Sequence, residues 1–74
     1  MADTERGHYS FRVSQYADGT PWIMTDPLRE SDNLKILGRG FIGFDLRPGT
    51  SYEKAEEIAR YLDEHIEHIT YTSL

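Results

Sequence analysis

The sequence predicts an α+β domain: a four-stranded antiparallel sheet, made of two β-hairpins, with one C-terminal amphipathic helix packed on one face. Three observations lead to this prediction. Apolar and polar residues alternate in residues 9–14 and 42–47, which is the pattern of a strand with one buried face. Turn residues separate these runs, and the last third of the chain has an apolar stripe at helical spacing.

The chain is long enough for one domain. Its 74 residues, 38% hydrophobic and 28% charged, are typical of a soluble globular protein with a small core. Because the sequence has no Cys, packing rather than disulfides must stabilise the fold. Residues 1–7 are polar and lack periodicity, so they are expected to form a disordered tail. Residues 8–74 are then a single ββββα domain.

The first hairpin is predicted around the turn at Asp18-Gly19. Tyr9, Phe11 and Val13 alternate with polar residues, which places these three side chains on the buried face of the first strand. Asp-Gly favours a type I′ turn, in which both central residues have positive φ. The segment WIMT is expected to return as the antiparallel partner.

The second hairpin is predicted from the segments LKIL and FIGFDL, which bracket a glycine-rich turn. In the second of these segments the alternation directs Ile42, Phe44 and Leu46 toward the core. Gly38 and Gly40 are interpreted as turn residues with positive φ. Gly43 is expected to mark a β-bulge or the close approach of another backbone segment.

The helix is the clearest element of the sequence. Pro48 and Gly49 end the preceding strand, and Thr50 with Glu53 forms the pattern of a capping box. The residues that follow place one apolar stripe on the helix, made of Tyr52, Ala55, Ile58, Ala59, Leu62, Ile66 and Ile69. The final segment TYTSL fits either a frayed end or a brief edge strand.

Charge and hydropathy exclude several classes of partner. The net charge is −5, and residues 51–74 carry six acidic and two basic residues, so they account for −4 of it. An acidic chain repels phosphate groups, so neither nucleic acid nor an anionic membrane is an expected partner. No run reaches the roughly 18 apolar residues of a membrane span, and a cytoplasmic location is expected.

The glycines Gly38, Gly40 and Gly43 have the spacing G-x-G-x-x-G of dinucleotide-binding loops. In such loops the glycine turn opens directly into a helix that receives the phosphates, whereas here an alternating segment follows. The glycines therefore favour a hairpin. The alternative is a small anionic ligand or a nucleotide bound at the Gly38–Gly43 hairpin, with Arg39 and Arg47 as its contacts.

No catalytic or metal site is expected from the sequence. His65 and His68 stand three residues apart on the predicted helix, a spacing that allows two imidazoles to share a metal, but no third ligand is identifiable. A solvated helix flank is the simpler interpretation. No nucleophile stands in a recognisable elbow, so we expect neither an enzyme nor a cofactor.

The predicted function is that of a small interaction or regulatory module, which binds a protein partner or a second copy of itself as a homodimer. One face of the predicted sheet is left uncovered by the single helix, and uncovered faces and strand edges are available to partners. Tyr61 lies off the apolar stripe on the same side of the helix as His65. The candidate interaction surface consists of Arg12, Arg39, Arg47, Tyr61 and His65.

Overall fold

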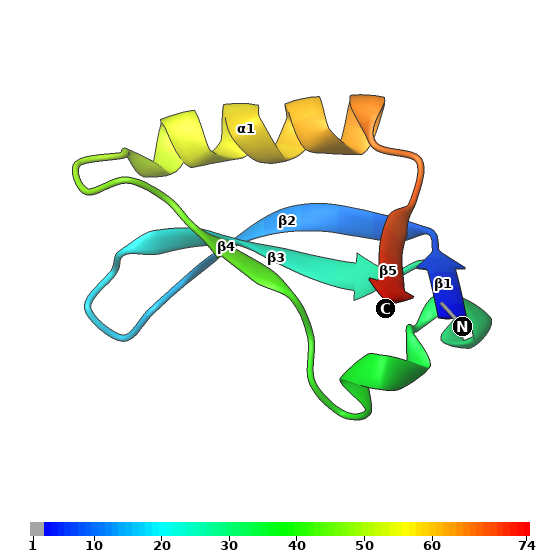
Figure 1. Ribbon diagram of the computed structural model, residues 1–74. Coiled ribbons are helices and arrows are strands. Elements are labelled where there is room, and N and C mark those ends of the chain that lie inside the picture. Colours follow the sequence, from blue (N-terminus) through cyan, green and yellow to red (C-terminus); the bar gives the residue numbers. More distant parts are fainter. Residues whose placement is uncertain (1–2) are drawn as a thin grey trace.

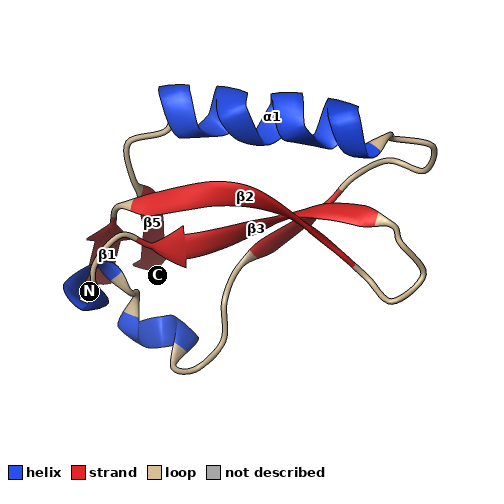
Figure 2. Cartoon of the chain, turned by 180° about the vertical axis from the view of Figure 1, so that it is seen from behind, coloured by secondary structure: helices blue, strands red, loops and turns tan. Residues whose placement is uncertain are grey.

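One long helix lies across a three-stranded antiparallel sheet, and a second sheet of two strands joins the two ends of the chain (Figure 1). A computed structural model describes residues 3–74. The elements follow one another as β1 (Asp3–Gly7), β2 (Tyr9–Gln15), β3 (Pro21–Pro27), the 3-10 helices η1 (Glu30–Asp32) and η2 (Lys35–Leu37), β4 (Gly43–Asp45), α1 (Tyr52–His65) and β5 (Ile69–Ser73). The helix covers one face of the larger sheet (Figure 2).

The α+β class, the antiparallel pairing and the single long helix agree with the sequence-based prediction, whereas the single four-stranded sheet does not. Strands β2, β3 and β4 form one sheet in that order, and β1 pairs with β5 in the other. In the larger sheet Phe11 lies opposite Thr25, and Ile23 lies opposite Phe44. The smaller sheet pairs Gly7 with Ile69.

The core lies between α1 and the larger sheet. Ile23 is completely buried at the centre of β3, where it packs with Phe11, Ala55 and Ala59. The two alanines allow the helix backbone to approach the sheet closely. The outer part of the core consists of the partly buried residues Val13, Leu46, Ile58, Leu62 and Ile69. The helical stripe is therefore buried mainly at its small residues, while Tyr52 at its start stays 45% exposed.

The predicted disordered tail is corrected by the structure. Of residues 1–7, Asp3–Gly7 form strand β1, and residues 1–2 lie outside the described part of the chain. Strand β1 pairs along its whole length with β5, which the final segment forms. The side chains of β1 are mostly exposed, so no alternation marks the strand in the sequence. Backbone pairing with a segment more than sixty residues away stabilises it instead.

The predicted second hairpin is also wrong. The segment LKIL does not form a strand, because residues 35–37 turn as the 3-10 helix η2, and β4 pairs with β3 instead. The preceding residue Leu34 is almost fully buried, and its backbone N–H donates to the hydroxyl of Tyr9 over 2.8 Å. Anchoring Leu34 in this way favours a compact turn over an extended strand at this point.

The turn glycines and Phe44 differ from expectation in detail. Gly19 has φ of +89° while no residue other than glycine has positive φ in the described chain, so the Asp18-Gly19 turn is not of type I′. Gly38 has positive φ as expected, at +56°, but Gly40 does not. Phe44 lies beside the core and stacks on Phe11, yet 42% of it remains exposed because β4 is the outer strand.

The helix cap differs from the prediction by one residue. Ser51, not Thr50, is the N-cap, and its hydroxyl accepts a 3.0 Å hydrogen bond from the backbone N–H of Lys54. The hydroxyl of Thr50 instead donates to the carbonyl of Arg47.

Replacing Ser51 by Ala should lower the free energy of unfolding by about 1 kcal/mol, because one N–H of the first helical turn loses its acceptor. Thr50→Ala is the matched control and should have a smaller effect. Urea denaturation followed by circular dichroism measures both. A larger loss for Thr50→Ala than for Ser51→Ala would contradict this assignment of the cap.

Candidate functional site: a groove beside an open strand edge

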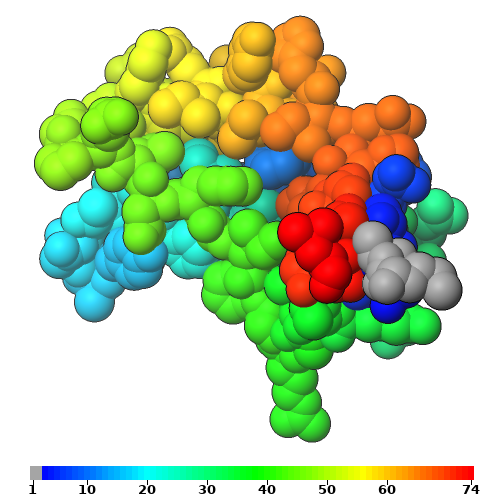
Figure 3. Space-filling view, viewed as in Figure 1, coloured from blue at the N-terminus to red at the C-terminus, as the bar shows by residue number. Residues whose placement is uncertain are grey.

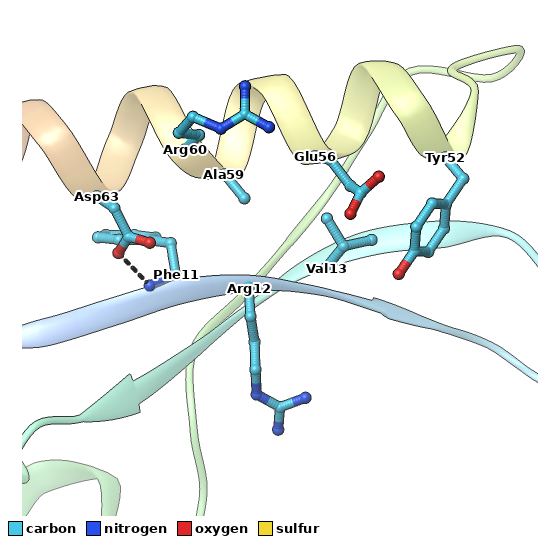
Figure 4. Close-up of a pocket in the computed structure, with 8 residues that line it drawn as sticks. All are labelled: Phe11, Arg12, Val13, Tyr52, Glu56, Ala59, Arg60 and Asp63. Carbon is cyan, nitrogen blue, oxygen red and sulfur yellow. Dashed lines mark hydrogen bonds between the residues drawn. The ribbon is translucent and has the colours of Figure 1, made fainter.

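A surface groove of about 400 Å³ runs between α1 and the adjacent strand β2 (Figure 4). The side chains of Phe11, Val13 and Ala59 supply its apolar lining. Tyr52 stands near one end of the groove and Asp63 near the other (Figure 4). The remaining lining residues are charged, namely Arg12, Glu56 and Arg60.

Strand β2 is an edge strand of the larger sheet, and its outer edge faces this groove. The backbone N–H of Phe11 points outward, because it donates to the Asp63 carboxylate over 2.7 Å rather than to a strand. In an antiparallel ladder the outward positions alternate, so the backbone groups of Val13 and Gln15 point to the same edge. These groups are available to an added strand.

The prolines of β3 agree with this alternation. Pro21 lies opposite Gln15 and Pro27 lies opposite Tyr9, both at positions where β2 directs its own backbone groups outward. Residues that face each other at such positions exchange no ladder hydrogen bond, so a proline without an N–H costs the β2–β3 pairing nothing there. The amino acid sequence therefore marks which edge positions of β2 remain unpaired.

The polar side chains that face the groove are acidic. Glu56 and Asp63 stand seven residues apart, two turns along the same side of α1, and both point toward β2 (Figure 4). Arg60 extends along the helix away from the sheet, and Arg12 points to the opposite face of the sheet (Figure 4). There Arg12 is held by Asp26, with Nε and Oδ2 2.6 Å apart. The groove therefore has an apolar floor and an acidic wall.

The face of the larger sheet opposite α1 carries a row of three aromatic side chains. Trp22 stacks between Tyr16 and Phe41, with ring centroids 5.3 and 5.9 Å away. Its ring also covers Gly43, where a side chain would collide with it, so Gly43 marks the approach of a ring rather than of another backbone. The hydroxyl of Tyr16 donates to Asp45, and this hydrogen bond raises the pKa of Tyr16.

The sequence contains a signal for the position of Trp22 in this aromatic row. Trp22 lies opposite Ser14 in the β2–β3 register, and Ser14 is one of the polar residues that alternate with Phe11 and Val13. Extending the alternation across the hairpin places Trp22 on the same face as Ser14. Phe41 precedes β4 and carries no such signal.

The five predicted interaction residues do not form one site. Arg12 lies on the uncovered face of the sheet, while Tyr61 and His65 lie on α1, where their rings are 4.3 Å apart. Arg39 is exposed in the loop before β4, which projects from the rest of the molecule (green in Figure 3). Arg47 is exposed in the segment that follows β4. The structure thus brings together only Tyr61 and His65.

The glycine-rich loop does not present the N–H groups that an anion would need. The N–H of Gly38 donates to the carbonyl of Lys35 over 3.1 Å, and that of Gly40 donates to Leu37 over 2.7 Å. Gly43 is the first residue of strand β4 and does not precede a helix. Two of the three glycine amides are therefore committed within the loop, and this geometry does not favour the anion-binding alternative.

The two helical histidines are separated in the structure. The ring of His65 contacts that of Tyr61 at a tilt of 42°, whereas His68 lies beyond the end of α1 and its ring contacts that of His8 at a tilt of 48°, with centroids 4.3 Å apart. His8 is in turn anchored by Asp32. The hydrogen bond from the backbone N–H of His8, helped by its ring and by Arg29, lowers the pKa of Asp32. His8 and Asp32 were not among the residues singled out from the sequence.

In comparisons with family models, curated proteins and solved structures, no match to this chain was found. Within residues 3–74, no helix is both long enough and apolar enough to cross a membrane.

Proposed function

We propose that this protein is a binding module that takes up an extended segment of a partner protein as an added strand on the edge of β2. The single observation that carries the proposal is the outer edge of β2, which no strand within residues 3–74 pairs with and which lies along the groove beneath α1. In this mode of recognition the backbone ladder supplies affinity, and side-chain pockets beside the ladder supply specificity.

The added strand would pair with Val13 and Gln15. The N–H of Phe11 is already satisfied by Asp63, so the ladder would extend from Val13 toward the turn at residues 16–20. Alternate side chains of the bound segment would then face the apolar floor at Val13 and Ala59. An open groove of this size suits side chains of moderate size.

The charge of the groove favours a basic segment. Glu56 and Asp63 face the groove, and the chain as a whole carries a net charge of −5. A Lys or Arg in the partner segment would find a carboxylate within reach, and the overall field would speed its association. The same charge disfavours a nucleic acid in this place. We therefore propose a protein partner with a basic, extended segment.

Hydrogen exchange tests the open edge in the free protein. We expect the amides of Val13 and Gln15 to exchange rapidly, because they point out of the sheet, and those of Arg12 and Ser14 to exchange slowly, because they pair with β3. Amide exchange measured by NMR resolves these four residues. Equal protection of all four amides in the monomer would contradict the open edge.

A displayed library of random peptides tests the binding itself. We expect selection to yield extended peptides with a basic residue, and their binding to protect the amide of Val13 from exchange. N-methylation of a selected peptide should abolish binding only at alternate residues, those that face β2. Bound peptides that change the NMR signals of Trp22 instead of protecting Val13 would refute the proposal. A selection that yields no peptide above background would also refute it.

Two variants at one position provide the matched control. Val13→Pro removes the outward N–H and should abolish binding, whereas Val13→Thr keeps the N–H and a similar shape and should retain it. Thermal melts of both variants establish that each one folds. Sedimentation at the same concentrations distinguishes a foreign segment from a second copy of this chain, since only the second copy would give a dimer without peptide.

A further inference from the structure

A cluster of metal-ligating side chains lies away from the groove, where the two-stranded sheet meets β2 and α1. The ligand atoms of His8, Glu67 and His68 all lie within 4.8 Å of one another. His8 links β1 to β2, and Glu67 and His68 link α1 to β5. Residues from the two ends of the sequence thus meet at one point.

The register of the small sheet places the two histidines face to face. Strand β1 pairs with β5 so that Gly7 lies opposite Ile69, and one further step along both strands brings His8 opposite His68. Side chains directly opposite in an antiparallel pair have Cβ atoms about 5 Å apart, and the ring centroids of these two histidines are 4.3 Å apart. Backbone pairing, rather than the helix, creates this juxtaposition.

Asp32 orients the imidazole of His8. Both the backbone N–H and the ring Nδ1 of His8 lie within hydrogen-bond distance of Asp32 Oδ1, at 3.2 and 3.3 Å. The carbonyl of His8 accepts from the N–H of Leu28 over 3.0 Å, so the backbone is held on both sides. A carboxylate only accepts hydrogen bonds, so Nδ1 is the donor and Nε2 remains free as a ligand.

In metalloproteins a histidine ligand commonly donates its other ring N–H to a carboxylate, which sets the tautomer and the direction of the ring. Asp32 has this relation to His8. Asp32 itself is only 8% exposed, and the Nε of Arg29 lies 3.4 Å from its second oxygen. The fold therefore fixes the position of the Asp32 carboxylate. This observation is independent of the clustering of the three ligands.

We propose that His8, Glu67 and His68 bind one divalent transition-metal ion of the Zn²⁺ class, with Asp32 as the positioning residue for His8. Two imidazoles and one carboxylate are a ligand set that Zn²⁺ accepts, and water would fill its fourth position. Neighbouring ligand atoms of a tetrahedral Zn²⁺ are about 3.4 Å apart. The ligand atoms must therefore close by at most about 1.4 Å, which the largely exposed Glu67 and a rotation of His68 allow.

The bound ion would tie the start of β2 to the end of α1. Two-stranded sheets are marginally stable on their own, and this clamp lies at the inner end of the β1–β5 ladder. Binding to the folded chain alone raises its apparent stability by mass action. At a free Zn²⁺ concentration one hundred times the dissociation constant, we expect Tm to rise by about 10 °C or more.

Isothermal titration of the untagged full chain with ZnCl₂ tests the proposal. We expect one ion per chain, a monomer in sedimentation at saturating Zn²⁺, and tetrahedral absorption bands when Co²⁺ replaces Zn²⁺. Mg²⁺ should give no heat of binding, because it prefers oxygen ligands. A stoichiometry of one ion for two chains would overturn the intramolecular site.

Histidine variants identify the ligands. His8→Gln and His68→Gln should each weaken Zn²⁺ binding at least tenfold, while His65→Gln, which removes an exposed imidazole only three residues from His68, should leave it unchanged. Glu67→Gln tests the third ligand at a largely exposed position and should also weaken binding. Equal losses in His65→Gln and His68→Gln, or full binding after both cluster histidines are replaced, would overturn the proposal.

Discussion

Replacing Ile23 by Ala should lower the free energy of unfolding by about 2–5 kcal/mol, which is enough to unfold much of so small a domain at moderate temperature. Ile23 has no exposed surface and lies at the centre of the middle strand, where it contacts the helix and both neighbouring strands. This loss has two parts: the free energy gained by burying the removed methyl and methylene groups is lost, and a cavity remains in their place. Urea denaturation followed by Trp22 fluorescence measures it.

Ile36→Ala is the matched control for this prediction. Ile36 is 54% exposed in η2 and takes no part in the core, so the same chemical change should cost less than about 0.5 kcal/mol. Comparable losses at Ile23 and Ile36 would show that the core does not lie between α1 and the larger sheet.

Replacing Gly7 by Ala should destabilise the β1–β5 sheet and lower the free energy of unfolding by about 1–3 kcal/mol. A Cβ at Gly7 would overlap the backbone carbonyl of Asp32, and a backbone atom cannot move aside as a flexible side chain can. The strand would have to shift away from η1. Amide exchange should show the loss first in residues 3–7 and 69–73, before the larger sheet is affected.

Gly40→Ala is the control for Gly7→Ala, because Gly40 does not have positive φ and its added Cβ would meet only the carbonyl of Leu37, at 3.1 Å. We expect a much smaller effect. If both variants unfold alike, the close packing of Gly7 against Asp32 is not a determinant of stability.

The sequence was most informative where side chains alone decide the structure. The alternation around Phe11 and the helical stripe around Ala55 correctly located β2, β3 and α1, because in these elements one face is buried. The segment before Gly38 is as apolar as a strand but forms η2. There the burial of Leu34 and its hydrogen bond to Tyr9 decide the conformation, and both depend on tertiary contacts.

The small sheet could not be predicted from side-chain patterns. Strand β1 exposes most of its side chains, so its stability comes from a backbone ladder to the other end of the chain, helped by the Thr4–Thr72 hydroxyl pair. The metal-ligand cluster depends on the same ladder. For this reason the helical spacing in the sequence pairs His68 with His65, whereas the structure brings His68 together with His8.

The groove was only partly foreseeable. The sequence predicts a strand edge among the surfaces available to a partner, but the interaction residues that it predicts are three arginines, a tyrosine and a histidine. The structure instead places Val13, Glu56 and Asp63 together. The hydrogen bond from Phe11 to Asp63 joins residues 52 positions apart, and no spacing rule connects a strand amide with a helix carboxylate at that separation.

The pairing of Asp3 with Ser73 leaves the outer ends of strands β1 and β5 side by side. Adjacent strands are about 5 Å apart, a span that a few linker residues cover. The fold of residues 3–73 is therefore suited to circular permutation: a short linker can join Asp3 to Ser73, and new ends can be opened in the exposed turn at residues 16–20. For the same reason it could be inserted into a surface loop of a host protein without forcing that loop apart.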